Sequence, residues 1–147
     1  MEKRASIDVA PLPVVMGSAS RLRQLFQNLI INALKFSKSG QVPMLQVRVQ
    51  PAHANELPSQ LHDRQDSPFW LVTVTDNGIG FDEKYKDRIF TPFQRLHDPK
   101  TYSGTGIGLA ICQRVAESHG GAIDVTSQPD SGSTFRIFLP VTDENRG

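Results

Sequence analysis

The chain has 147 residues, of which 38% are hydrophobic, so it can form one globular domain (residues 1–147) with a substantial core. A formal net charge of +1 gives no electrostatic case for contact with nucleic acid or an anionic membrane surface, and no apolar run could span a bilayer. The one cysteine, Cys112, excludes an internal disulfide and a cysteine-built metal site. We expect it to pack as a small apolar side chain in a reducing compartment, which favours a cytoplasmic location.

Two stretches of helical periodicity alternate with strand-like runs. The first helix is capped by Ser18 or Ser20 and runs to about Ser37, and the second spans about residues 107–118 and is stopped by a glycine pair. The first strand-like run contains two prolines, which places it at a sheet edge. The predicted strands lie within residues 5–16, 45–49, 69–75, 122–127 and 133–140.

Two longer segments connect these elements. Residues 51–67 are polar and turn-rich and are predicted to form a surface loop within a hairpin. Residues 81–103 are charged and interrupted by proline, and they predict a long functional loop with a short helix from Glu83 to Ile89. Because the strands come mainly as adjacent antiparallel pairs, the order predicts a two-layer α/β sandwich. Helices would cover one face of a mixed, mostly antiparallel sheet.

A stripe of three polar residues runs along one side of the first predicted helix. Asn28, Asn32 and Lys35 fall within roughly 40–60° of one another, beside an apolar face. Two amides and an ammonium at the edge of a core are costly unless something polar meets them. Amide oxygens suit Mg²⁺ and lysine suits phosphate, so the stripe predicts a site for an oxygen-rich anion and its cation. The apolar face consists of Leu22, Leu25, Phe26, Leu29, Ala33 and Phe36.

Two glycine-rich segments adjoin predicted elements. Asp76-Asn77-Gly78-Ile79-Gly80 ends the strongest strand, where glycines allow close backbone approach and Asp76 could accept a hydrogen bond from an amine such as adenine N6. Alone, this segment also fits an ordinary turn. Residues 104–110, GTGIGLA, open the second helix, where exposed N–H groups and the helix dipole suit phosphate. They lack the preceding strand of a dinucleotide fold and the Gly-Lys-Ser/Thr ending of a P-loop.

Aromatic and basic side chains mark the long loop. The aromatic side chains of Phe90 and Phe93 would be exposed in this loop unless they pack against an apolar surface. Arg95 could bind a phosphate through its guanidinium. The alternative is a loop pinned to the core by its aromatic residues, with Arg95 in solvent. Because few core residues anchor residues 81–103, we expect this loop to be mobile without nucleotide.

Taken together and in this order, the segments resemble the ATP-binding catalytic domain of sensor histidine kinases. The shared pattern is Asn-x₃-Asn-Ala-x-Lys, Asp-x-Gly-x-Gly, Phe-x₂-Phe and Gly-x-Gly-x-Gly, followed by residues 132–135 (GSTF) and Leu139-Pro140. The likeness covers nearly the whole chain, and residues 92–97 (PFQRLH) resemble phytochrome-type kinases. It implies a Bergerat-type ATP fold with a lid between the glycine-rich segments. In one departure, Ser18 stands where the family often has aspartate, but serine caps a helix equally well.

The resemblance implies a role for each matching position. Asn32 would hold Mg²⁺, Asn28 would support the metal or the phosphates, and Lys35 and Arg95 would contact phosphates. Asp76 would bind adenine. Asn28, Lys35 and Arg95 are thus the expected catalytic residues, and ATP and Mg²⁺ the expected cofactors. The other positions expected at the nucleotide are Gly78, Gly80, Gly104, Thr105, Gly106, Ile107, Gly108, Leu109 and Thr134.

The implied reaction transfers the γ-phosphoryl group of ATP to a histidine. This chain has only His53, His62, His97 and His119, which we interpret as surface or capping residues. The acceptor is therefore expected on a dimerisation domain absent from this chain. The domain alone would be monomeric and would not autophosphorylate, and a response regulator is the expected downstream partner.

Two other functions are alternatives to the kinase. ATP-hydrolysing members of the wider superfamily carry a glutamate general base one helical turn before the metal-binding asparagine, where this chain has Asn28. A carboxamide accepts no proton at neutral pH, so hydrolysis should be slow. The other alternative is a non-catalytic nucleotide-binding module, against which the intact motif set argues.

Overall fold

The computed structural model describes residues 6–9, 17–38, 40–64, 67–85, 88–90 and 108–141. A five-stranded sheet has the order β1-β2-β3-β5-β4. β1 pairs parallel to β2 and the other neighbours are antiparallel, so the predicted mixed, mostly antiparallel sheet is confirmed. The strands are β1 (Ser6–Val9), β2 (Met44–Pro51), β3 (Phe69–Asp76), β4 (Ala122–Ser127) and β5 (Ser133–Pro140).

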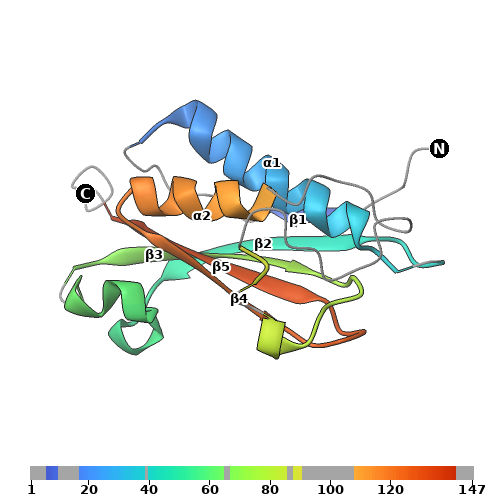
Figure 1. Cartoon of the computed structure of the whole chain (residues 1–147). Coiled ribbons are helices and arrows are strands. Elements are labelled where there is room, and N and C mark those ends of the chain that lie inside the picture. Colours follow the sequence, from blue (N-terminus) through green and yellow to red (C-terminus); the bar gives the residue numbers. More distant parts are fainter. Residues whose placement is uncertain are drawn as a thin grey trace.

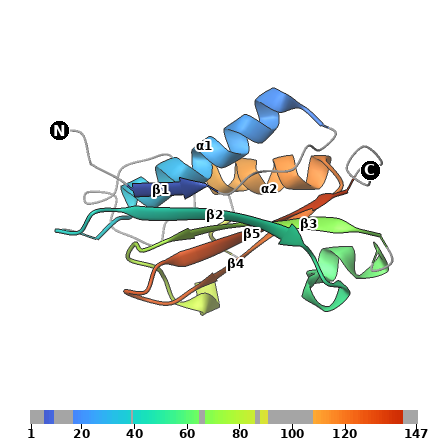
Figure 2. The same ribbon diagram turned by 180° about the vertical axis from the view of Figure 1, so that it is seen from behind.

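Two helices, α1 (Ala19–Lys35) and α2 (Gly108–Ser118), cover one face of this sheet (Figure 1). Seen from behind, β1 lies at the sheet edge beside β2, as the proline-containing segment predicted (Figure 2). The apolar faces of helices and sheet meet in the main core. Its buried side chains include Leu25, Leu29, Ala33, Leu45, Val47, Val72, Val74, Cys112, Val115, Ala116, Ile123, Val125, Phe135, Ile137 and Leu139.

The first helix begins and ends at identifiable signals. The Ser18 hydroxyl accepts a hydrogen bond from the Arg21 N–H at 3.2 Å, which identifies Ser18 as the N-cap. The helix ends at Lys35, two residues earlier than predicted, and the Phe36 N–H still bonds to the Asn32 carbonyl at 3.1 Å. Gly40, at φ +80°, then adopts the left-handed backbone that glycine tolerates.

The two helices run antiparallel, and hydrogen bonds join them at the start of α1 and near its middle. At one end the His119 ring bonds to the Val115 carbonyl through Nδ1 (2.8 Å), so its Nε2 accepts the Ser18 N–H (3.0 Å). In the middle, the Cys112 thiol donates to the Leu25 carbonyl (3.4 Å), and burial raises the pKa of Cys112 to about 12. The free, buried cysteine is as predicted, and the pairing fixes α2 relative to α1.

The prediction for residues 51–67 was incomplete. The segment contains two 3₁₀ helices, Ala54–Glu56 and Ser59–Arg64, and the side chains of Leu57 and Leu61 are only 5% and 4% exposed. These leucines pack with Phe69, Leu71, Ala122 and Phe138 in a second apolar cluster. It lies on the sheet face opposite the helices (Figure 1). Two leucines in an otherwise polar segment form no helical or strand-like pattern, so their burial could not be predicted from the sequence.

Candidate nucleotide site

Asp76 is the last residue of β3 and points to the helix-covered face of the sheet, because it alternates in register with buried Val72 and Val74. Its Oδ1 accepts the N–H groups of Gly78 at 2.8 Å and Ser133 at 3.3 Å. Within the described part of the chain, both of its hydrogen bonds go to Oδ1, which leaves Oδ2 as an acceptor for a ligand. Burial raises the pKa of Asp76, and the two N–H groups partly offset this.

Glycines let three segments meet around Asp76. A Cβ on Gly78 would lie 2.6 Å from the Phe36 carbonyl oxygen, at the end of α1. That same oxygen accepts the Ile79 N–H at 2.9 Å. A Cβ on Gly132, which has φ +80°, would collide with the Asp76 carbonyl. Because these glycines have no side chain, residues 76–80 (the Asp76 loop) can pack between the end of α1 and the β4–β5 turn.

The polar stripe of α1 reaches from this loop to the start of α2. The Asn28 Nδ2 donates to the Gly108 carbonyl at 3.4 Å, across 80 positions of sequence. At the other end, the Lys35 ammonium lies 5.1 Å from the centre of the Phe36 ring, beside the Asp76 loop. Helical spacing places Asn32 between them, and all three stripe residues are partly exposed. The structure therefore places Asn28, Asn32 and Lys35 along one face of α1, with Gly108 at the start of α2 bonded to Asn28.

Five expected site residues belong to the part of the chain that the structure does not describe. Arg95, Gly104, Thr105, Gly106 and Ile107 lie outside the described residues. The last glycine of that segment, Gly108, begins α2. Its neighbour Leu109 is partly buried and packs against the main core.

The structure does not bring Thr134 to Asp76. Its hydroxyl lies 3.2 Å from that of Thr75, on the sheet face opposite the helices, because the core residues Phe135 and Ile137 fix the alternation of β5. The residue that meets Asp76 is Ser133, which sequence analysis missed. The strand register explains the contact, because Thr75 pairs with Thr134 and the next position along the antiparallel ladder sets Ser133 opposite Asp76.

Two residues in the described part of the long loop are anchored in the core. Ile89 and Phe90 are only 8% and 9% exposed, and the Phe90 ring meets Phe135 edge-on with centroids 6.3 Å apart. The 3₁₀ turn Glu83–Tyr85 stands where a longer helix was expected. The aromatic docking place is thus the core for Phe90, whereas Phe93 and His97 lie outside the described residues.

The described residues contain no cluster of three or more His, Cys, Asp or Glu side chains that could hold a metal. Amide and phosphate oxygens are ligands that Mg²⁺ accepts. No helix in the same residues is long and apolar enough to cross a membrane.

The structure is a two-layer α/β sandwich in which a carboxylate among glycines lies near an amide-bearing helix. The model of the histidine kinase-, DNA gyrase B- and HSP90-like ATPases matches residues 17–143, and the chain belongs to that family. The expected family and fold are confirmed.

Relatives and solved structures place the chain among the kinases of this family. It is 44% identical over 145 residues to cyanobacterial phytochrome A of Nostoc sp., covering 99% of this chain and 17% of that protein. It is 41% identical to the phytochrome-like protein Cph1 of Synechocystis sp., covering 95% and 17%. The mycobacterial sensor histidine kinase MprB aligns with a TM-score of 0.69 at 28% identity, covering 93% and 80%. The chain is thus a catalytic domain of the histidine kinase type, and it spans only 17% of the length of these two phytochromes.

Proposed function

We propose that this domain binds Mg·ATP and donates the γ-phosphoryl group to a histidine on a dimerisation domain outside residues 1–147. The proposal rests on the hydrogen bonding of Asp76. Its Oδ1 accepts two backbone N–H groups, which leaves Oδ2 to accept the amine of a base near the polar stripe of α1. One similar structure, ShkA (TM-score 0.65, 25% identity), was solved with AMPPNP. A response regulator is the proposed downstream partner of the parent protein.

The residues of this chain divide the work by chemistry. Asp76 Oδ2 accepts the adenine amine, and Lys35 with Arg95 contacts the phosphates. Asn28 and Asn32 supply amide oxygens to Mg²⁺, and the donation from Asn28 Nδ2 to Gly108 fits this role because it leaves Oδ1 as the ligand. When bound, the metal would neutralise phosphate charge. The glycine-rich segment before α2 and that helix's N-terminus would hold phosphate oxygens. Phosphoryl transfer needs mainly such positioning and charge neutralisation.

Calorimetry and phosphotransfer together test this proposal. The isolated domain is titrated with ATP in the presence and absence of Mg²⁺, and then incubated with ATP and the parent protein's dimerisation domain. We expect saturable, Mg²⁺-strengthened binding, no phosphorylation of the domain alone, and acid-labile phosphohistidine on the added domain. A folded domain that binds no ATP would contradict nucleotide binding altogether. Binding without transfer would leave only a nucleotide-sensing module.

An ATP-hydrolysing switch is the second candidate, and Asn28 discriminates between the two. We expect the wild-type domain to hydrolyse ATP slowly, because an amide stands where a general base is needed. Asn28→Glu supplies a carboxylate and is expected to raise the Mg²⁺-dependent ATPase rate, measured by phosphate release. Asn28→Gln, which has the same length and no basic group, is the control. Equal rates for both variants would contradict the role assigned to this position.

A further inference from the structure

Two buried serines meet at the end of β4 and the start of β5. Ser127 and Ser133 are 5% and 9% exposed, and their hydroxyl oxygens lie 2.8 Å apart. Buried hydroxyls cost free energy unless each is hydrogen-bonded, so the partners of this pair define what it holds in place.

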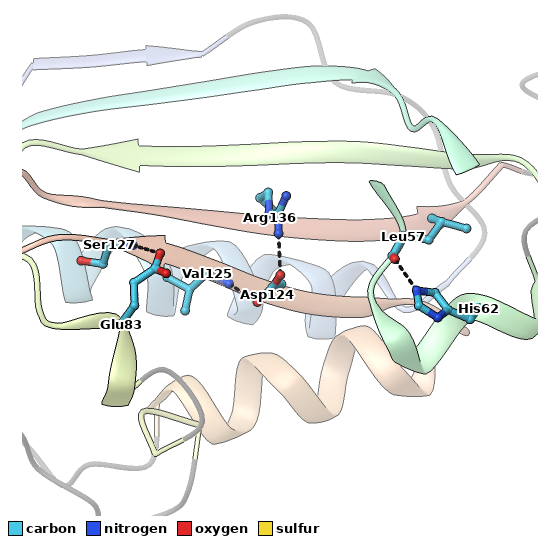
Figure 3. Close-up of polar contacts among 7 residues, drawn as sticks. All are labelled: Leu57, His62, Glu83, Asp124, Val125, Ser127 and Arg136. Atoms are coloured by element: carbon cyan, nitrogen blue, oxygen red, sulfur yellow. Dashed lines mark hydrogen bonds and ion pairs between the residues drawn. The ribbon is translucent and has the colours of Figure 1, made fainter. Parts of the chain in front are cut away.

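Ser127 joins three segments of chain. Its hydroxyl donates to the Gly132 carbonyl at 2.8 Å and accepts the Phe81 N–H at 3.0 Å. Its single proton is thereby committed, so the Ser133 hydroxyl donates to Ser127. The backbone N–H of Ser127 donates to the Glu83 carboxylate at 3.2 Å (Figure 3). The end of β4, the β4–β5 turn and the segment after the Asp76 loop are therefore tied to one side chain.

One peptide group connects Ser127 to Asp76. The carbonyl of Gly132 and the N–H of Ser133 belong to the same peptide unit. Ser127 donates to that carbonyl, and the N–H donates to Asp76 Oδ1 at 3.3 Å. Because a peptide is planar, fixing its carbonyl fixes the direction of its N–H. Hydrogen bonds in such a chain also polarise one another.

We propose that Ser127 is a positioning residue for base recognition: it orients the Gly132–Ser133 peptide so that Asp76 is held through Oδ1 and presents Oδ2 to the exocyclic amine of adenine. The inference rests on the proposed function. It adds a residue that touches no nucleotide and acts through the carboxylate that does.

The test uses a pair of ligands that differ only in that amine. The affinity of ATP is compared with that of purine riboside triphosphate, which carries hydrogen in place of the 6-amino group, by calorimetry well below each variant's unfolding temperature. A hydrogen bond to a charged group is worth roughly tenfold or more in affinity, so the wild type should prefer ATP by that factor. In Ser127→Ala we expect this preference to fall at least about threefold. A purely structural loss would weaken both ligands equally and leave the ratio unchanged.

Matched variants sharpen the result. Ser127→Thr keeps the hydroxyl and should restore the preference. Thr126→Val removes a hydroxyl from the adjacent residue, exposed on the opposite sheet face, and should leave it unchanged. If Ser127→Ala does not fold, Ser127→Cys has a similar shape with a much weaker donor and should also lower the ratio.

The outcomes separate the two proposals. A wild-type domain that binds both ligands equally would contradict the adenine role of Asp76, and with it the proposed function as argued. A wild type that prefers ATP, with the same preference in folded Ser127→Ala or Ser127→Cys, would overturn the role of Ser127 alone.

Discussion

Replacing Asp76 with asparagine is expected to lower ATP affinity by roughly 10- to 100-fold while raising the free energy of unfolding of the ligand-free domain. Asparagine retains Oδ1, so the bonds from Gly78 and Ser133 survive. It replaces Oδ2 with an amide that donates where the adenine amine also donates, and the lost bond to a charged acceptor accounts for the magnitude. Stability rises because the variant no longer buries a charge.

The pH dependence follows from the raised pKa of Asp76. In the folded domain the ionised carboxylate is disfavoured, so its cost to stability is absent below the ordinary carboxyl pKa and fully present above the raised one. Between these values, its contribution to the free energy of unfolding falls as pH rises. ATP affinity changes in the opposite sense and falls as pH is lowered through the raised pKa, because a protonated Asp76 is a poorer acceptor.

Calorimetry and urea unfolding at several pH values measure both effects. Asp63→Asn removes an exposed carboxylate from the 3₁₀ helix Ser59–Arg64 and is the control. An Asp76→Asn variant with unchanged ATP affinity would contradict the assignment of Asp76 to the base.

Replacing Gly132 with alanine should be among the most damaging single changes to the domain. Gly132 has φ +80°, and a Cβ there would collide with the carbonyl of Asp76. Gly40→Ala is a matched control, because Gly40 has the same φ of +80° but nothing within 4 Å of an added Cβ. Both variants bear the left-handed strain of about 1–2 kcal/mol. Only Gly132→Ala adds a steric cost, of roughly 1–3 kcal/mol.

Urea denaturation of both variants measures the difference in the free energy of unfolding, and ATP titration of the folded fraction measures the effect on the site. We expect weaker ATP binding in Gly132→Ala alone, because the collision displaces Asp76. Equal destabilisation of the two variants would show that the turn yields without moving β3.

The sequence was most informative where periodicity and glycine spacing act locally. The 3.6-residue period placed Leu25, Leu29 and Ala33 in the core and left Asn28, Asn32 and Lys35 beside it, as the structure has them. The antiparallel pairs β2–β3 and β4–β5 were also predicted, because their strands are adjacent in the chain, whereas the central pairing of β3 with β5 was not. The fold class and the turn after Asp76 were predictable on these grounds, whereas the family was predicted from the resemblance of the combined motifs.

What escaped prediction depends on contacts between distant segments. The contact of the Ser133 N–H with Asp76 rests on the register of β5 against β3, which a motif match by residue type ignores. The burial of Leu57 and Leu61 rests on the far face of the sheet, which composition alone does not reveal. The bond between Asn28 and Gly108 joins positions 80 residues apart, so no local pattern encodes it.

Cys112, at the contact between α1 and α2, allows the separation of these two helices to be measured chemically. Cys112 is fully buried there and is the chain's one thiol, and with its pKa raised to about 12 it is almost wholly un-ionised at neutral pH. Alkylating reagents attack the thiolate, so modification requires the two helices to separate first. The rate at which Cys112 of the unmodified protein is alkylated therefore measures how often the two helices separate. Nucleotides that stabilise the packing of α1 on α2 can be ranked by how far they lower this rate.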